Sequence, residues 1–358
     1  MKRSLITLIL LVSLLPIFGS SYDFFHHRLS FTWFTQESLY PESTISPFSA
    51  TSTLNMISLT EGQPRSIRYT DPDSGTYEDI PFLEGDKYAD ETMYLQLKTG
   101  INIGFFRLSF PPYIETEMAF QGALNTVFQG FGGADTVGFD GAFFFGFNTR
   151  WFDRINIRAG FQHYSGHYGD ETLLKIGDQS GSPVEYVRDN NLLIGISVNP
   201  ASFVRLYVEA SSPMENTWMK PSIHIPLWVI KRTNGQPLHI VESEHDGVST
   251  TDFADAYRAW ILNGGVELSA PIPTIGAAFL ALDVLAHQDG QTLHMPGGYD
   301  SENPWEFEYT IGAGIEFSDV IGQANARILV TYHDGRFPLL NFHYLRSRYF
   351  GLGFFVSS

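Results

Sequence analysis

The stretch of sequence that decides the fold reads INIRAGFQHYSGHYGDE and runs from Ile155 to Glu171. From Ile155 to Phe161 the odd positions are apolar, and the even positions are polar or glycine. Successive side chains of a β-strand point to opposite faces, so this stretch predicts a strand with one apolar and one polar face. The alternation then places three polar residues, His163, Ser165 and His167, on the apolar side.

The same alternation recurs along the chain, and connections of two lengths separate the segments. Expected strands lie near residues 24–34, 94–109, 114–128, 139–150, 155–165, 192–198, 204–210, 260–268, 280–286, 307–317, 324–330 and 342–356. Short connections (110–113, 151–154, 199–202, 270–274, 318–322) alternate with long ones (35–93, 129–138, 166–185, 212–256, 288–305, 334–341). Outer-membrane barrels have short periplasmic turns, longer extracellular loops and an even number of strands.

The sequence therefore predicts an all-β fold, a transmembrane antiparallel up-and-down β-barrel of about 12 strands, with short periplasmic turns and long extracellular loops. A secreted β-sandwich also has alternating strands. Its exposed face is expected to be rich in Thr, Lys and Glu rather than in Gly and Asn, and it leaves the alternating loop lengths unexplained.

The N-terminus has the order of a secretory signal peptide: charged Lys2 and Arg3, an apolar run, and small residues up to Ser21. That run is shorter than the roughly 20 residues a spanning helix needs, and it contains Pro16. We expect cleavage after Ser21, which leaves residues 22–358 as one barrel domain in the bacterial outer membrane, with long loops near 35–93 and 212–256. The aromatic C-terminal strand is expected to engage the barrel assembly machinery.

Composition excludes several classes of protein. The chain has no cysteine, which excludes a disulfide framework and a lipid-modified N-terminal cysteine. The net charge of −17 argues against a nucleic-acid partner, because binding to nucleic acid depends on cationic contacts with phosphates. After the N-terminal segment no run of about 18 apolar residues occurs, so membrane residence has to come from strands.

The polar residues of the 155–171 stretch form a candidate site. A serine hydroxyl is inert until a base takes its proton, and His163 lies two positions from Ser165 on one strand face. The pair is similar to that of outer-membrane phospholipase A and the lipid A deacylase barrels, whose His-x-Ser pair lies on the outward face. The resemblance implies hydrolysis of phospholipid or lipid A acyl esters, with His163 as base, Ser165 as nucleophile and His167 as a further candidate.

In those families an acid or amide on a neighbouring strand orients the histidine. The sequence identifies no outward-facing acid at the matching height, because Asp170 and Glu171 lie in the loop. These two carboxylates are instead candidates for calcium, which prefers carboxylate oxygens. No other cofactor is expected. His163 and His167 are too far apart for a two-histidine metal site unless Gly166 bulges.

A longer pattern, His163-x-Ser165-x-His167-x-Gly169-Asp170-Glu171 together with the aromatic and arginine-rich residues 346–352, resembles a bacterial outer-membrane barrel family of unknown function. Gly166 departs from the small hydroxyl residue expected there. This resemblance implies a location and a fold but no activity. The structural interpretation of the stretch is that His and Tyr are common at membrane interfaces and that Gly-Asp-Glu begins an ordinary loop.

The polar strand faces are expected to line the lumen, with charges of both signs. The expected lumen-lining residues are Glu115, Glu117, Asp140, Arg150, Arg158, Arg205, Glu209, Glu267, Asp283 and Arg327. Mixed signs favour a solvated or cross-linked interior, and the acidic excess favours cations if a pore exists. The sequence thus favours a structural or channel role, with an outer-membrane lipid hydrolase as the alternative and outer-membrane lipid or lipopolysaccharide as partner.

Overall fold

The computed structural model describes residues 22–24, 29–35, 37–70, 77–83, 89–130, 135–176, 183–185, 188–213, 224–225, 227–231, 239–242, 248–249, 260–288, 305–321 and 324–357. The predicted signal peptide and most of the predicted loop 212–256 lie outside the described residues. No helix among the described residues is long and apolar enough to cross a membrane.

Twelve antiparallel strands form the wall of a closed barrel. They are β3 (Ser52–Glu61), β6 (Met93–Phe110), β7 (Ile114–Gln129), β8 (Asp135–Trp151), β9 (Ile155–Tyr168), β11 (Arg188–Ala201), β12 (Val204–Pro213), β17 (Ile261–Ile272), β18 (Gly276–His287), β19 (Glu306–Ile321), β20 (Ala324–Arg336) and β21 (Arg346–Ser357). Each pairs with its neighbour in this order, and β3 closes the ring by pairing with β21. The predicted fold class and strand number are confirmed.

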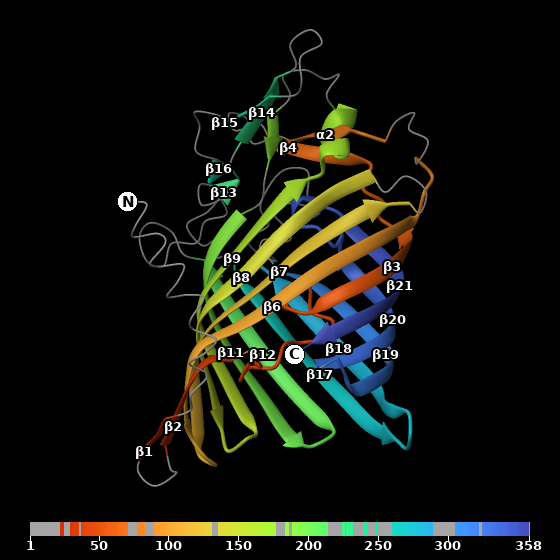
Figure 1. Cartoon of the computed structure of the whole chain (residues 1–358). Helices are drawn as coiled ribbons and strands as arrows, with labels where there is room; N and C mark the ends of the chain where they lie inside the picture. The colour runs from red at the N-terminus through yellow and green to blue at the C-terminus, as the bar shows by residue number, and fades with distance from the viewer. Residues whose placement is uncertain are drawn as a thin grey trace, which may run out of the picture.

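The remaining elements lie around the barrel. They are β1 (Tyr22–Phe24), β2 (Leu29–Thr35), β4 (Ser66–Thr70), β5 (Tyr77–Pro81), α2 (Asp170–Ile176), β10 (Pro183–Glu185), β13 (His224–Ile225), β14 (Leu227–Lys231), β15 (His239–Glu242), β16 (Val248–Ser249) and the 3₁₀ helix η3 (Leu340–Phe342). The strands tilt strongly, with short turns at one end and the β4–β5 hairpin and α2 at the other (Figure 1).

The predicted first strand, 24–34, and the predicted loop, 35–93, both differ from the structure: the strand at this place is β2, and the loop contains the wall strand β3. β2 pairs with β6 from Ser109 to Gly104, and β3 pairs with β6 from Lys98 to Met93, so β2 and β3 run in the same direction along one neighbour. Residues 37–51, called the lumen segment below, leave the wall between them and enter the barrel. The loop prediction failed because the Ser-, Thr- and Pro-rich composition of this segment suits a buried hydrogen-bonded path as well as a solvated loop.

Apolar side chains cover the outside of the wall and a capping cluster covers its loop end. Phe143, Phe145 and Phe147 of β8 are exposed outward, whereas their neighbour Phe144 is buried inside. The cap packs residues of β4, β5 and α2 against the connection between β20 and β21. Because η3 and the residues after it belong to this cap, the last strand starts at Arg346 rather than at the predicted Phe342.

Candidate active site on the outward face of the barrel

Strand β9 keeps an unbroken register over its whole length, and this fixes where the candidate residues point. It pairs with β8 from Ile155 to Tyr168 and with β11 from Ile155 to Ser165 without a register shift. No bulge interrupts the alternation. His163, Ser165 and His167 therefore stay on the outward face, half-buried between neighbours, while Tyr164 is buried in the lumen.

Asn190 of β11 is the hydrogen-bond partner of His163. The two residues are directly opposite in the β9–β11 register, and Nδ1 of His163 lies 2.7 Å from Oδ1 of Asn190. An amide oxygen only accepts, so Nδ1 donates and the lone pair of the ring lies on Nε2. That tautomer is the one a general base toward Ser165 requires, because Nε2 is then free to take a proton.

The surface beside Ser165 is open on the β8 side and bordered by aromatic rings. Gly141 is opposite Ser165, and a Cβ atom built at Gly141 would lie 3.5 Å from the Ser165 hydroxyl oxygen. On either side, Phe143 lies 5.0 Å from the His163 ring and Phe139 stacks on His167 at 4.8 Å. Gly141 therefore places no side chain beside the Ser165 hydroxyl, between the neighbouring rings of Phe139 and Phe143.

The predicted calcium ligands, Asp170 and Glu171, lie next to each other at the start of α2. Asp170 and Glu171 occupy the first turn of α2, and Glu171 Oε2 accepts the Thr136 backbone N–H at 3.1 Å. Calcium takes six to eight oxygen ligands. No group of three or more His, Asp or Glu side chains within the described ranges is arranged to hold a metal ion. We therefore assign Glu171 a structural contact at the end of β8 and derive no chemistry from a metal.

The ten residues expected in the lumen lie on inward-facing positions, and most belong to ion pairs. Arg150 pairs with Glu115, Arg205 with Glu267 at 2.9 Å, and Arg158 with Glu209 at 2.5 Å. Arg327 pairs with Glu316, and Glu117 pairs with Arg107. Asp283 accepts hydrogen bonds from Tyr207 and Asn263, and Asp140 accepts the Leu340 backbone N–H.

These wall residues hold the lumen segment. Glu117 accepts the backbone N–H of Leu39, and Glu267 accepts that of Thr44, each at 2.8 Å. Arg205 donates to the carbonyl oxygens of Pro41 and Glu42. The lumen thus contains a chain segment whose backbone polar groups are satisfied by the charges of the wall.

Asn190 is a candidate site residue that the sequence analysis missed. Leu192, Ile194 and Ile196 of β11 all face outward, and extending that alternation by one step places Asn190 on the same face. The expected strand started at Leu192, so the polar residues before it were left in the loop. The alternation along β11 could have indicated that Asn190 faces outward. Its pairing with His163 depends on the β9–β11 register, which cannot be read from the long connection between these two strands.

No family model and no curated protein matches the chain. Among solved structures, similar ones include the calcium-bound dimer of outer-membrane phospholipase from Salmonella typhi (9% identity, covering 90% of this chain and 94% of that chain, TM-score 0.48). Outer-membrane phospholipase A from Escherichia coli is also similar (9% identity, covering 86% of this chain and 92% of that chain, TM-score 0.44). So is a FadL homologue from Pseudomonas aeruginosa (8% identity, covering 90% of this chain and 95% of that chain, TM-score 0.36). The likeness concerns the fold, and the chain has the architecture of a bacterial outer-membrane β-barrel.

Proposed function

We propose that the protein is an outer-membrane lipid hydrolase that cleaves acyl esters on the outward face of the barrel. The observation that carries the proposal is the 2.7 Å hydrogen bond between His163 Nδ1 and Asn190 Oδ1, on the same face as Ser165. A nucleophile, a base and a group that orients the base are the three parts of a serine hydrolase. All three side chains face the region that lipid occupies around a transmembrane barrel.

The proposed mechanism follows from the roles of these side chains. Ser165 Oγ attacks the ester carbonyl carbon while Nε2 of His163 takes the hydroxyl proton. The C–O bond of the ester then breaks, the acyl group stays on Ser165, and the proton on Nε2 passes to the leaving alkoxide. A water molecule then attacks the acyl-serine and gives a proton to the same nitrogen. The bond between the acyl carbon and Ser165 Oγ breaks, Nε2 returns the proton to Oγ, and the fatty acid leaves. Asn190 keeps the imidazole in the required tautomer and orientation.

The interior of the barrel supports this proposal over a channel. The cavities among the described residues of the lumen include one of about 120 Å³ under the cap and one of about 430 Å³ at the short-turn end. Arg205 and Glu267 line the second cavity and bind the lumen segment that lies between the two. A solute would have to displace this segment to cross, whereas a lipid in the outer leaflet can reach Ser165 directly.

The test is hydrolysis of phospholipid or lipopolysaccharide acyl esters by refolded protein in detergent. Ser165→Ala and His163→Ala are each expected to lose nearly all activity, by about 10²-fold or more, and Asn190→Ala a smaller part of it. Ser58→Ala, which changes an outward serine on β3, is the matched control and should retain activity. Wild-type protein without activity, or equal activity in all variants, would overturn the proposal. Loss in His167→Ala with full activity in His163→Ala would reassign the base.

A further inference from the structure

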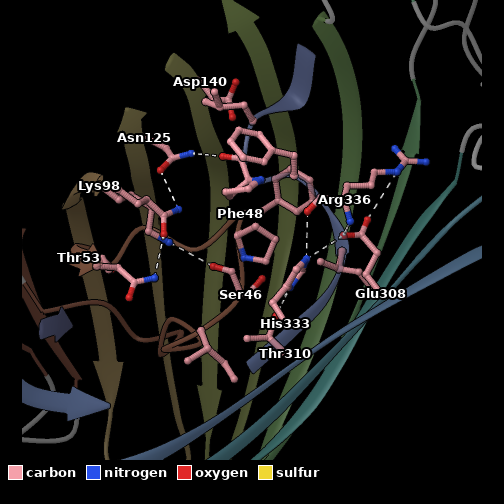
Figure 2. Close-up of a pocket in the computed structure, with 18 of the residues that line it drawn as sticks. Ser46, Phe48, Thr53, Lys98, Asn125, Asp140, Glu308, Thr310, His333 and Arg336 are labelled. Atoms are coloured by element: carbon pink, nitrogen blue, oxygen red, sulfur yellow. Dashed lines mark hydrogen bonds and ion pairs between the residues drawn. The ribbon is translucent and has the colours of Figure 1, made fainter. Parts of the chain in front are cut away.

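A chamber inside the barrel, under the cap, contains polar groups without a hydrogen-bond partner. The chamber has a volume of about 120 Å³ and lies between the lumen segment, which contributes Ser46 and Phe48, and the cap, which contributes Phe337 and Leu339. Figure 2 shows Lys98 and Asn125 on one side of it and Glu308, His333 and Arg336 on the other. It is separate from the outward-facing Ser165.

Lys98 is a buried ammonium group with a donor to spare. The residue is 6% exposed, and Nζ donates to the Ser46 carbonyl oxygen and the Ser49 hydroxyl, both at 3.2 Å. An ammonium group has three N–H donors, so one remains. No carboxylate of the described part of the chain lies within 4 Å of this nitrogen, although Glu42 and Asp283 act on it from further away.

Unpartnered oxygen atoms lie beside Lys98 on the chamber wall. Thr53 is directly opposite Lys98 in the β3–β6 register, and Asn55 is on the next inward row. Oγ1 of Thr53 and Oδ1 of Asn55 are buried without a hydrogen-bond partner. Oγ1 of Thr331 is also buried without a hydrogen-bond partner. A Cβ atom built at Gly351 would contact both this oxygen and Asn55 Oδ1. A buried polar atom without a partner costs about 1–3 kcal/mol, and a hydroxyl, unlike an amide oxygen, can also donate, so the Thr53 and Thr331 hydroxyls point to a polar ligand in the chamber.

The other charges of the chamber already have partners. Glu308 accepts from His287 at 2.5 Å and from the Arg336 backbone N–H at 2.8 Å. Asp140 accepts the Leu340 backbone N–H with both oxygens, at 3.0 and 3.2 Å. Lys98 is therefore the charged group of the chamber with unused bonding capacity, and it selects the sign of the ligand.

We propose that this chamber binds a small organic monocarboxylate. The carboxylate accepts the free N–H of Lys98 and the hydroxyl proton of Thr53, in a charge-assisted contact that is stronger than a neutral hydrogen bond. The rest of the molecule packs on the apolar lining, which includes Ile45, Phe48 and Leu339. A dry cavity of about 150 Å³ accommodates the six carbon atoms of benzene, so the chamber of about 120 Å³ suits a ligand of about five non-hydrogen atoms, its carboxylate included.

The experiment measures binding of labelled propionate to the full-length protein in detergent micelles by equilibrium dialysis, with empty micelles as the blank. Propylammonium and propanamide serve as probes of the same length with the opposite charge and no charge. Propionate is expected to bind at least tenfold more tightly than either. Lys98→Met is expected to abolish the preference, whereas Lys175→Met, a matched change on α2 outside the chamber, should leave it unchanged.

A second variant, Ala123→Leu, fills the chamber from β7 without changing its charge, and is expected to weaken propionate binding at least tenfold. This variant tests the proposal even if Lys98→Met does not fold. Preference for propylammonium, equal binding of all three probes, or propionate binding that survives Ala123→Leu in a folded barrel would overturn the proposal. Ser165→Ala should bind propionate as the wild type does, so this result is independent of the hydrolase proposal.

Discussion

Arg158 lies between two carboxylates inside the barrel, with Nη1 3.2 Å from Glu42 Oε1 and Nη2 2.5 Å from Glu209 Oε2. Glu42 belongs to the lumen segment and Glu209 to β12, so one guanidinium group joins the segment to the wall. Its carbon also lies 4.6 Å from the centre of the Tyr40 ring.

Replacing Arg158 by Met is expected to destabilise the folded barrel by about 3–5 kcal/mol, because two buried carboxylates lose their shared cation. The measurement is urea unfolding in detergent, followed by tryptophan fluorescence. Arg65→Met removes an exposed pair with Asp90 at 4.0 Å and should cost less than about 1 kcal/mol. Equal effects of the two variants would show that the Arg158 pairs contribute no more than surface contacts.

Replacing residues 38–50 by a Gly-Ser linker of about six residues is expected to open the lumen. The gap on β6 between the ends of β2 and β3, from Gly104 to Lys98, is about 20 Å long, which such a linker can span. In planar bilayers the wild type should show no steady conductance, whereas the variant should conduct and prefer cations. Equal conductance of the two proteins would contradict a blocking role for the segment.

A larger side chain at Gly141 is expected to reduce ester hydrolysis if acyl chains approach Ser165 from the β8 side. Gly141→Ala adds a Cβ at an ordinary contact distance of 3.5 Å from the hydroxyl oxygen and should retain most activity. Gly141→Leu should lower kcat/KM at least tenfold while leaving the unfolding midpoint in urea nearly unchanged, because its side chain projects toward lipid. Full activity in the leucine variant would exclude this approach.

The refolded protein is expected to show a β-type circular dichroism spectrum and a gel mobility that changes on heating, as a closed transmembrane barrel does. A spectrum dominated by helix, or full solubility without detergent, would contradict the fold. The signal can be followed in the variants above, so each activity measurement is made on protein known to be folded.

The sequence predicted the barrel because its signals are local. Alternation such as that from Ile155 to Phe161 requires only the two faces of one strand, and the short and long connections are read directly from residue numbers. The same alternation placed His163 and Ser165 on the apolar face of that strand, and the unbroken register of β9 in the structure shows that this face points outward. In contrast, the partner of His163 depends on how far β11 extends beyond Leu192 and on its register with β9.

The lumen segment was not predictable for a related reason. Its residues between Glu37 and Thr51 have the composition of a loop, and what keeps them inside is a set of partners distant in sequence, such as Glu267 for the backbone of Thr44. Pairings of this length leave no periodic trace in the chain. The polar faces of the wall strands predicted that charges line the lumen, but not that a chain segment would bind them.

The position of the lumen segment has a consequence for assembly. β3 follows it directly in the chain, and β3 is the strand that seals the barrel against β21. Closure of the wall by β3 and filling of the lumen by the preceding segment are therefore covalently coupled. The hydrogen bonds that hold the segment join residues more than 200 positions apart, as between Thr44 and Glu267. Such long-range contacts form slowly. Defects in the segment should consequently reduce the yield of inserted protein in cells more than they alter the barrels that complete assembly.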